Sequence, residues 1–164
     1  MSVGEPYGTI PLWCKGGTRL QDNIIVKPSV EKQVDRFLRQ GRVLFFSAPC
    51  GFGKTAVAEA LLSGREVLRL SADSAGFKLP SAETDWQILL LDDLQDMQEE
   101  QDWNALCELI RACPERRFVL LSRGTPPGSL MAFQYTGLMT VLEADDLLFD
   151  ADDVRRLLRL YGVE

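Results

Sequence analysis

One short loop gathers the residue types that bind phosphate: two glycines followed by a lysine and a threonine. It reads Ala48-Pro49-Cys50-Gly51-Phe52-Gly53-Lys54-Thr55, the A-x-x-x-x-G-K-T form of a Walker A loop, with alanine where the first glycine is usual. The backbone N–H groups of such a loop and the start of the next helix make a site for anions. We expect Lys54 to contact the β- and γ-phosphates of a nucleotide and Thr55 to place its hydroxyl on Mg²⁺.

The segments on either side of this loop have the character that the motif requires. The apolar run Val43–Phe46 before it is typical of a buried strand, and residues 55–62 after it favour a helix that Gly64 ends. Strand, glycine loop and helix in that order distinguish a phosphate loop from a chance match. The alternative interpretation, a glycine turn before an ordinary helix, is weakened by a second motif.

That second motif is a pair of acids after an apolar run. Ile88–Leu91 is followed directly by Asp92 and Asp93, which is the Walker B pattern. We expect Asp92 to help hold Mg²⁺, directly or through water, and Asp93 to polarise the attacking water. Such a pair alone could be an acidic loop after a core strand, but together with a Walker A loop it favours nucleotide chemistry.

A third apolar run, Phe118–Leu121, ends in Ser122 and Arg123. A guanidinium fixed at that strand end could reach the γ-phosphate and distinguish ATP from ADP. The alternative is a surface arginine with no ligand. Arg116 and Arg117 begin the same strand at the end away from the ligand, and we expect solvent around them.

The elements that position these groups alternate between strand and helix. Apolar strands that alternate with helices predict a parallel sheet covered on both faces, in which ligands bind beyond the C-terminal strand ends. The fold class is therefore α/β, a three-layer P-loop NTPase with a mostly parallel sheet. The expected strands are 43–47, 66–70, 88–91, 118–121 and 140–142. The first expected helix begins at Pro28, with Ser29 as N-cap, and stops at Gly41; two more span 55–62 and 102–112, and a last amphipathic helix begins at Asp150 or Ala151. Residues 71–85 and 124–128 are expected to be loops.

Composition narrows the function further. The 164 residues suit one domain, and 46% apolar with 26% charged residues indicates a globular chain. A net charge of −6 disfavours DNA and anionic membrane as direct partners of this segment. The chain has no histidine, which excludes Ser–His and Cys–His catalysis. No apolar run has membrane length and the N-terminus lacks an export signal, so we expect a cytoplasmic protein.

The four cysteines, of which none forms a C-x-x-C pair, are expected to be reduced thiols. Cys107 and Cys113 are interpreted as half-buried packing residues. Cys50 lies inside the phosphate loop near a helix start, a position that can activate a thiol, although a small loop filler is the simpler interpretation.

Three blocks together resemble a known family. Residues 46–55, 91–95 and 119–123, read in this order, are similar to the ATPase domain of STAND proteins, and most of all to the N-terminal ATPase module of large ATP-binding LuxR-type (maltose-regulator-like) transcription regulators. Residues 147–153 are similar to a later segment of that family. The resemblance implies ATP/ADP and Mg²⁺ as cofactors and a nucleotide switch that hydrolyses ATP slowly in bacterial signalling.

The resemblance runs from about Ile24 to the chain end, so residues 1–23 are interpreted as an N-terminal arm and 24–164 as the P-loop ATPase domain. Relatives continue into winged-helix, sensor and DNA-binding domains, which implies that this chain is a fragment or a reduced version. Those domains are then the implied partners, with possible ATP-dependent self-association. The chain departs from the family at Gln95, where histidine is common, and at 71–85, where a long helical stretch is usual; the sheet would then lack one covering helix.

The resemblance also adds residues to the predicted site. Ile25, Val26 and Lys27 match the family's adenine-side segment, with Lys27 where arginine is usual. The predicted nucleotide-binding residues are Ile25, Val26, Lys27, Ala48, Pro49, Cys50, Gly51, Phe52, Gly53, Lys54, Thr55 and Ala56; the predicted catalytic residues are Lys54, Asp93 and Arg123; the predicted metal ligands are Thr55 and Asp92.

Two other functions fit the same motifs. A small P-loop kinase or phosphotransferase would need an acceptor pocket and usually an arginine-rich lid, and no arginine cluster follows the third strand. A module that binds nucleotide without hydrolysing it is the other alternative, and Asp93 argues against it.

Overall fold

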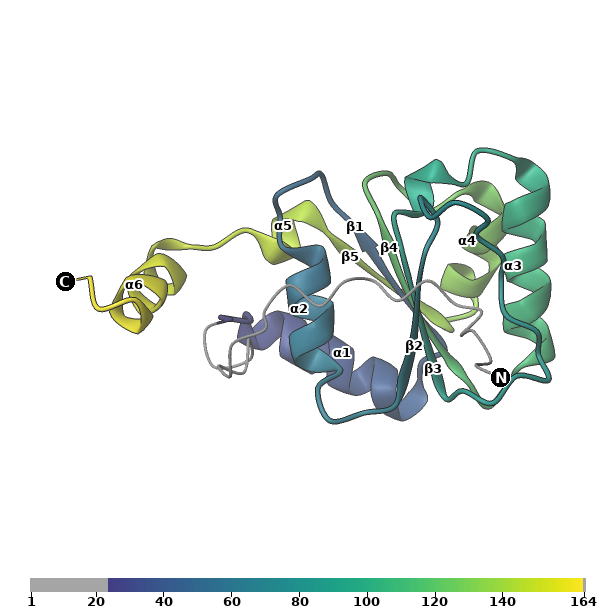
Figure 1. Ribbon diagram of the computed structural model, residues 1–164. Coiled ribbons are helices and arrows are strands. Elements are labelled where there is room, and N and C mark those ends of the chain that lie inside the picture. The colour runs from purple at the N-terminus through teal and green to yellow at the C-terminus, as the bar shows by residue number, and fades with distance from the viewer. Residues whose placement is uncertain (1–23, 164) are drawn as a thin grey trace, which may run out of the picture.

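Five parallel strands form the centre of the chain, in a computed structural model that describes residues 24–163 (Figure 1). The predicted arm at 1–23 and Cys14 lie outside the described residues. Across the sheet the order is β2-β3-β4-β1-β5. The strands are β1 (Val43–Ser47), β2 (Val67–Ser71), β3 (Ile88–Asp92), β4 (Arg117–Ser122) and β5 (Met139–Glu143). The α/β fold class with a parallel sheet is confirmed.

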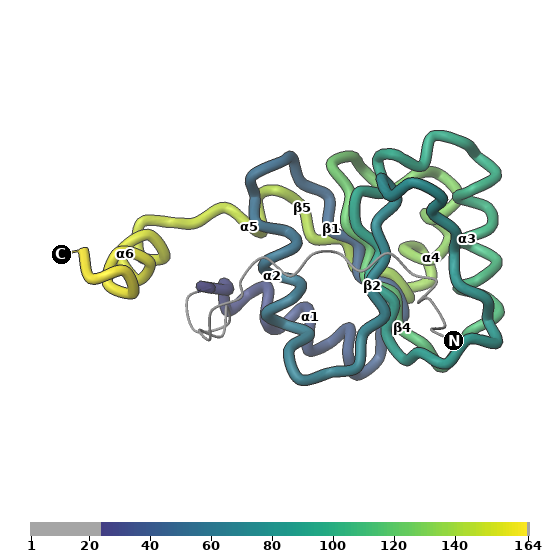
Figure 2. The backbone as a smooth tube through the Cα atoms, viewed as in Figure 1, coloured from purple at the N-terminus to yellow at the C-terminus, as the bar shows by residue number. Residues whose placement is uncertain are grey.

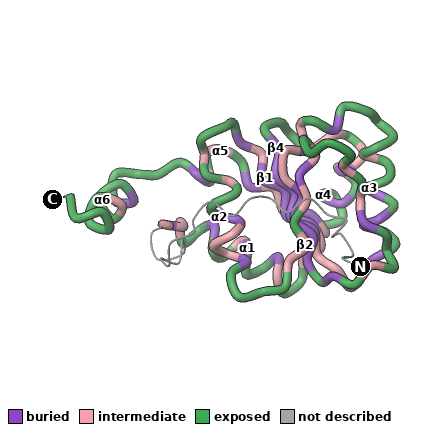
Figure 3. Tube along the Cα trace, in the orientation of Figure 1, coloured by how far each residue is buried: buried purple, intermediate pink, exposed green. Residues whose placement is uncertain are grey.

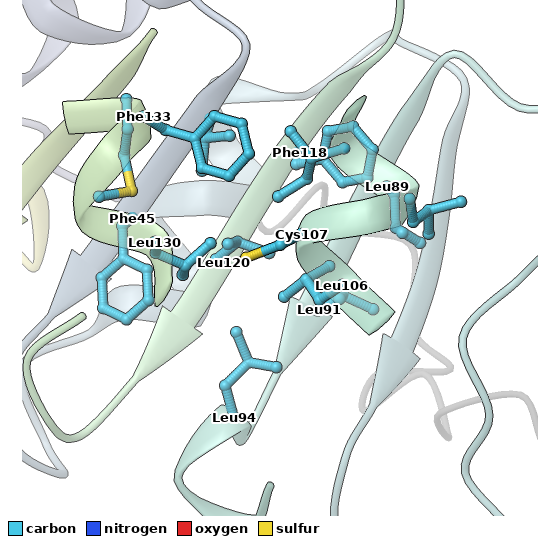
Figure 4. Packing of buried hydrophobic residues seen from close by; sticks show 14 of the residues in the cluster. Phe45, Leu89, Leu91, Leu94, Leu106, Cys107, Phe118, Leu120, Leu130 and Phe133 are labelled. Atoms are coloured by element: carbon cyan, nitrogen blue, oxygen red, sulfur yellow. The ribbon is translucent and has the colours of Figure 1, made fainter. Parts of the chain in front are cut away.

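The three central strands carry only apolar residues between their polar ends, because helices cover both of their faces. Successive side chains of a strand point to opposite faces. Alternate residues therefore join two separate clusters, one with Phe45, Leu89, Leu91, Phe118 and Leu120, and one with Leu44, Phe46, Leu90, Val119 and Leu121. Figure 4 shows the first cluster, in which the strand side chains meet those of α3 (Glu100–Ala112) and α4 (Gly128–Tyr135).

The second cluster packs against helices on the other face of the sheet. These are α1 (Pro28–Gln40), α2 (Lys54–Leu61) and the short α5 (Ala144–Leu147). α1 begins with Pro28 at its first turn and ends at Gly41, where a Cβ would lie 2.9 Å from the Phe37 Cα. The predicted stop at Gly41 is confirmed. The predicted N-cap Ser29 is wrong, since Lys27 takes that position and proline is well suited to the first helical residue.

Two helices are not expected from the sequence. α4 begins at Gly128, inside the predicted loop, and its apolar residues 130–133 are consecutive, so its pattern has little helical period. α5 is a single turn, at whose start the Glu143 N–H donates to the Asp146 Oδ2 at 2.8 Å. By contrast, residues 72–87 between β2 and β3 hold no helix, as expected. The sheet therefore lacks a helix at that connection.

The last helix, α6 (Ala151–Leu160), stands apart from the layers in Figures 1 and 3. The amphipathic pattern predicts it, and Asp150 caps it by accepting from the N–H groups of Asp152 and Asp153. Several of its apolar side chains are nevertheless exposed, with Val154 at 42% and Leu160 at 45%. In residues 24–163, no helix combines the length and apolar character needed to cross a membrane.

Candidate functional site

The glycine loop follows β1 and leads into α2 at the C-terminal edge of the sheet. Figure 2 shows this loop and the chain leaving β4 at the same, upper edge. Gly51 and Gly53 have φ of 87° and 72°, a left-handed conformation that other residues rarely adopt. Open space surrounds both positions, so backbone conformation and not crowding requires glycine there. Gly53 caps α2, whose N-terminal N–H groups and dipole attract anions.

The Lys54 side chain lies back across this loop. Its Nζ donates to the carbonyl oxygens of Ala48 at 2.6 Å and Pro49 at 2.9 Å. Burial lowers the pKa of Lys54, and the negative charge of Asp92 opposes that change. A partly buried, hydrogen-bonded ammonium at a helix start can hold an anion by charge and direct contact. Around it, Ala48 is buried, whereas Pro49, Cys50 and Ala56 are exposed.

Thr55 and Asp92 meet although they come from different parts of the chain. The Thr55 Oγ1 donates to the Asp92 Oδ2 at 2.7 Å, and the other carboxylate oxygen accepts from the Asp93 N–H at 2.7 Å. A hydroxyl and a carboxylate are hard oxygen ligands of the kind Mg²⁺ takes, and this ion usually keeps several waters besides one or two protein ligands. Within 24–163, no cluster of three or more acidic, cysteine or histidine side chains could hold a metal ion.

Asp93 has the one positive φ among described residues other than glycine, 55°. Aspartate tolerates this left-handed conformation better than most residues. The Gln95 Nε2 donates to its Oδ1 at 2.9 Å, and the Ser71 Oγ lies 3.2 Å from its Oδ2. The Ser71 hydroxyl has one proton and a closer acceptor, Asp73 Oδ1 at 2.6 Å. The backbone conformation and the hydrogen bond from Gln95 therefore fix the direction of the Asp93 carboxylate.

Arg123 lies next to this acid. β4 lies between β1 and β3 and is parallel to both, so the chain after Ser122 leaves the sheet beside the two motifs, as expected. The Arg123 Nη2 is 3.7 Å from the Asp93 Oδ1, and its side chain remains 56% exposed. Ser122 is buried and its Oγ accepts from the Gly124 N–H at 3.2 Å. The guanidinium is therefore near the acid and open to a ligand.

The structure adds two residues that the sequence analysis does not place in the site, Ser71 and Gln95. Ser71 is the last residue of β2, so the rule that leads to Asp92 and Ser122 could have found it. Gln95 lies in a 3-10 turn, Leu94–Asp96, and accepts from the Arg123 N–H at 3.2 Å. No sequence pattern indicates that contact, because it depends on how two strand exits diverge.

A mostly apolar pocket of about 380 Å³ adjoins the start of α2. It is lined by Ile24, Ile25, Gly51, Phe52, Gly53, Ala56, Val57, Leu147, Leu148, Phe149 and Leu157. Of the three residues predicted on the adenine side, Ile25 is in the lining. Val26 packs against the α1 side of the core, and the Lys27 Nζ donates to the Leu148 carbonyl at 2.8 Å. Lys27 thus holds a segment that lines the pocket.

Comparison with solved structures identifies the fold. The Walker-type ATPase of Pyrococcus abyssi superposes with a TM-score of 0.55 at 12% identity, over 86% of this chain and 60% of that one. Aeropyrum pernix Orc1, solved in complex with DNA, superposes with a TM-score of 0.54 at 14% identity, over 85% of this chain and 50% of that one. Drosophila ORC bound to DNA superposes with a TM-score of 0.51 at 13% identity, over 100% of this chain and 56% of that one. These likenesses show the P-loop NTPase fold. The chain spans about half to three fifths of the length of these proteins. No protein-family model and no curated protein matches the sequence.

Proposed function

We propose that this chain binds ATP with Mg²⁺, hydrolyses it slowly and serves as the nucleotide switch of a bacterial signalling or transcription regulator of the STAND type. The observation that carries the proposal is the Thr55–Asp92 hydrogen bond of 2.7 Å beside the Lys54 ammonium. Phosphate oxygens would replace the Ala48 and Pro49 carbonyls on Lys54. Mg²⁺ would be held by the Thr55 hydroxyl and, directly or through water, by Asp92.

The apolar pocket suits the base of the nucleotide. It lies at the start of α2, on the same loop that would hold the phosphates, and its lining side chains carry no charge. A flat base would bury its faces against Ile25 and Phe52, and binding energy would come from apolar contact. ATP and ADP would both occupy this pocket, so it supports affinity for either nucleotide.

Switching requires that ATP and ADP be bound differently, because a ligand bound equally by two states shifts nothing. Arg123 supplies the difference in this proposal, since its exposed guanidinium can reach a third phosphate beside Asp93. The ATP state would act on winged-helix, sensor and DNA-binding domains of a longer chain, or promote self-association. The net charge of −6 opposes direct DNA contact by this segment.

Nucleotide binding without hydrolysis is the second candidate. Gln95, Ser71 and Arg123 all lie against the Asp93 carboxylate, and a carboxylate engaged in this way has less capacity to polarise a water. The two candidates share every binding residue and differ only in what Asp93 does.

Single-turnover hydrolysis of Mg²⁺-ATP separates them. Asp93→Asn keeps the shape of the side chain and loses its charge, so the proposal expects near-normal ATP binding and a rate lower by about 10²- to 10⁴-fold. Asp85→Asn, the same change at an exposed residue before β3, is the matched control and should match the wild type. Equal rates for wild type and Asp93→Asn would remove Asp93 from hydrolysis and favour the binding module.

A further inference from the structure

Gln95 lies between the acid after β3 and the chain that leaves β4. Its Nε2 donates to the Asp93 Oδ1 at 2.9 Å, and its Oε1 accepts from the Arg123 backbone N–H at 3.2 Å. A weaker contact of 3.4 Å joins the Nε2 to the Asp96 Oδ2. One side chain thus contacts both of the residues to which the proposed function gives hydrolysis and ATP sensing.

The chemistry of these neighbours requires a group that both donates and accepts. An ionised carboxylate only accepts hydrogen bonds and a backbone N–H only donates them, whereas a side-chain amide does both from one planar group. This pairing also fixes the orientation of the Gln95 amide, since the reversed amide would face each neighbour with the wrong atom. A glutamate of the same shape would keep the bond to the Arg123 N–H and set a second negative charge beside Asp93.

The backbone explains why such a link matters at this place. Pairing between β3 and β4 ends at Leu91 and Leu120, whereas β4 remains paired with β1 as far as Ser122. The exits of β3 and β4 therefore continue beyond the last of their own ladder pairs. Gln95 joins those exits across this gap, where backbone hydrogen bonds no longer hold them in register.

We propose that Gln95 is a positioning residue that holds Asp93 and Arg123 in one fixed relation, so that hydrolysis and discrimination of ATP from ADP both depend on its amide. This inference deepens the proposed function and rests on it. Loss of the amide then lowers both properties together. Asp93→Asn lowers the rate alone, and Arg123→Ala acts chiefly on discrimination.

The test compares Gln95→Glu with Gln98→Glu, the same change at an exposed residue three positions later. For each variant, calorimetry gives the ATP and ADP dissociation constants and single turnover gives the hydrolysis rate between pH values of about 5 and 9. Gln95→Glu should lower the rate and the ATP-over-ADP preference by about ten- to a hundred-fold each, as with other groups that orient a reacting side chain. Two adjacent carboxylates retain a proton to higher pH than one. As the pH is lowered, the hydrolysis rate of Gln95→Glu should therefore begin to fall at a higher pH than the rate of the wild type.

A third variant, Gln95→Met, removes both hydrogen bonds without adding charge and should lower both properties without moving the pH profile. It also serves if Gln95→Glu folds poorly, as a thermal melt would show. Wild-type ATP binding and hydrolysis, with both Gln95 variants equal to Gln98→Glu, would overturn this inference and leave the proposed function intact. A wild type that binds no ATP would overturn the proposed function and this inference with it.

Discussion

The two ends of the sheet use arginine in opposite ways. At the C-terminal end, Arg123 follows β4 with a guanidinium that is 56% exposed and 3.7 Å from the Asp93 carboxylate. At the N-terminal end, Arg116 precedes the same strand, and its guanidinium lies over the Trp86 ring, 4.4 Å from the ring centroid. One strand thus carries one arginine free to meet a ligand and one used in packing.

Arg42, before β1, is a second arginine at the N-terminal end whose guanidinium contacts the protein and not a ligand. Its Nη2 donates to the carbonyl of Cys113 at 3.0 Å and to that of Ile110, at the end of α3. It therefore satisfies carbonyls that the last turn of a helix leaves unpaired. The prediction that Arg116 and Arg117 are in solvent is wrong. Both are half-buried, and each has one buried nitrogen without a hydrogen-bond partner among the described residues.

The contrast teaches where a parallel sheet can place chemistry. At the C-terminal end three strand exits bring a loop, two acids and an arginine together, and the polar groups contact one another while remaining partly exposed. At the other end the arginine side chains contact helix carbonyls, in the case of Arg42, and an aromatic ring, in the case of Arg116. Changes at the first end should alter nucleotide binding, and changes at the second should alter stability.

The largest difference between the two ends is expected from the arginines that flank β4. Arg123→Ala should lower the preference for ATP over ADP by about ten- to a hundred-fold, since a hydrogen bond to a charged group contributes roughly 1.5–3 kcal/mol. Arg116→Ala, the matched change at the other end, should leave that preference unaltered. Titration calorimetry with each nucleotide measures both. If Arg123→Ala weakens the binding of ATP and of ADP equally, Arg123 does not distinguish the two nucleotides and the proposed contrast between the two ends is wrong.

A smaller effect is expected from Arg42→Ala. It removes the partner of two helix carbonyls and should lower the free energy of unfolding by roughly 1–3 kcal/mol, with nucleotide affinities unchanged. Urea denaturation gives the free energy, and Arg65→Ala, at an exposed turn residue, is the control. Equal stability of the two variants would mean that the Arg42 contacts contribute nothing, and a large loss of ATP affinity would contradict the division between the ends.

Much of the fold could be predicted because its strands are unambiguous. Short, continuous apolar runs bounded by polar residues are typical of strands buried on both faces. The expected strand 43–47 therefore coincides with β1, and the other four agree with the structure to within about one residue at each end. α4 could not be predicted because its burial follows tertiary packing and not period. The exposed apolar side of α6 could not be foreseen either, since an amphipathic pattern indicates a helix and not what covers it.

The candidate site divides in the same way. Lys54, Thr55, Asp92 and Asp93 could be proposed from motifs, and the structure brings them to one edge of the sheet. The contacts of Gln95 could not, because one of its hydrogen bonds spans 28 positions of the sequence and the other crosses a turn. A motif of neighbouring residues can be recognised in a sequence, whereas a contact between the exits of two strands cannot.

Titration of the chain with Mg²⁺-ATP tests the central claim, that the C-terminal end of the sheet is a nucleotide site. Wild type and the control Lys32→Ala, an exposed lysine on α1, should bind alike, and chelation of Mg²⁺ should weaken the affinity of both. Lys54→Ala should bind far more weakly, because it loses the ammonium that faces the phosphates. Unchanged ATP affinity in Lys54→Ala, or no binding by the wild type, would contradict the account.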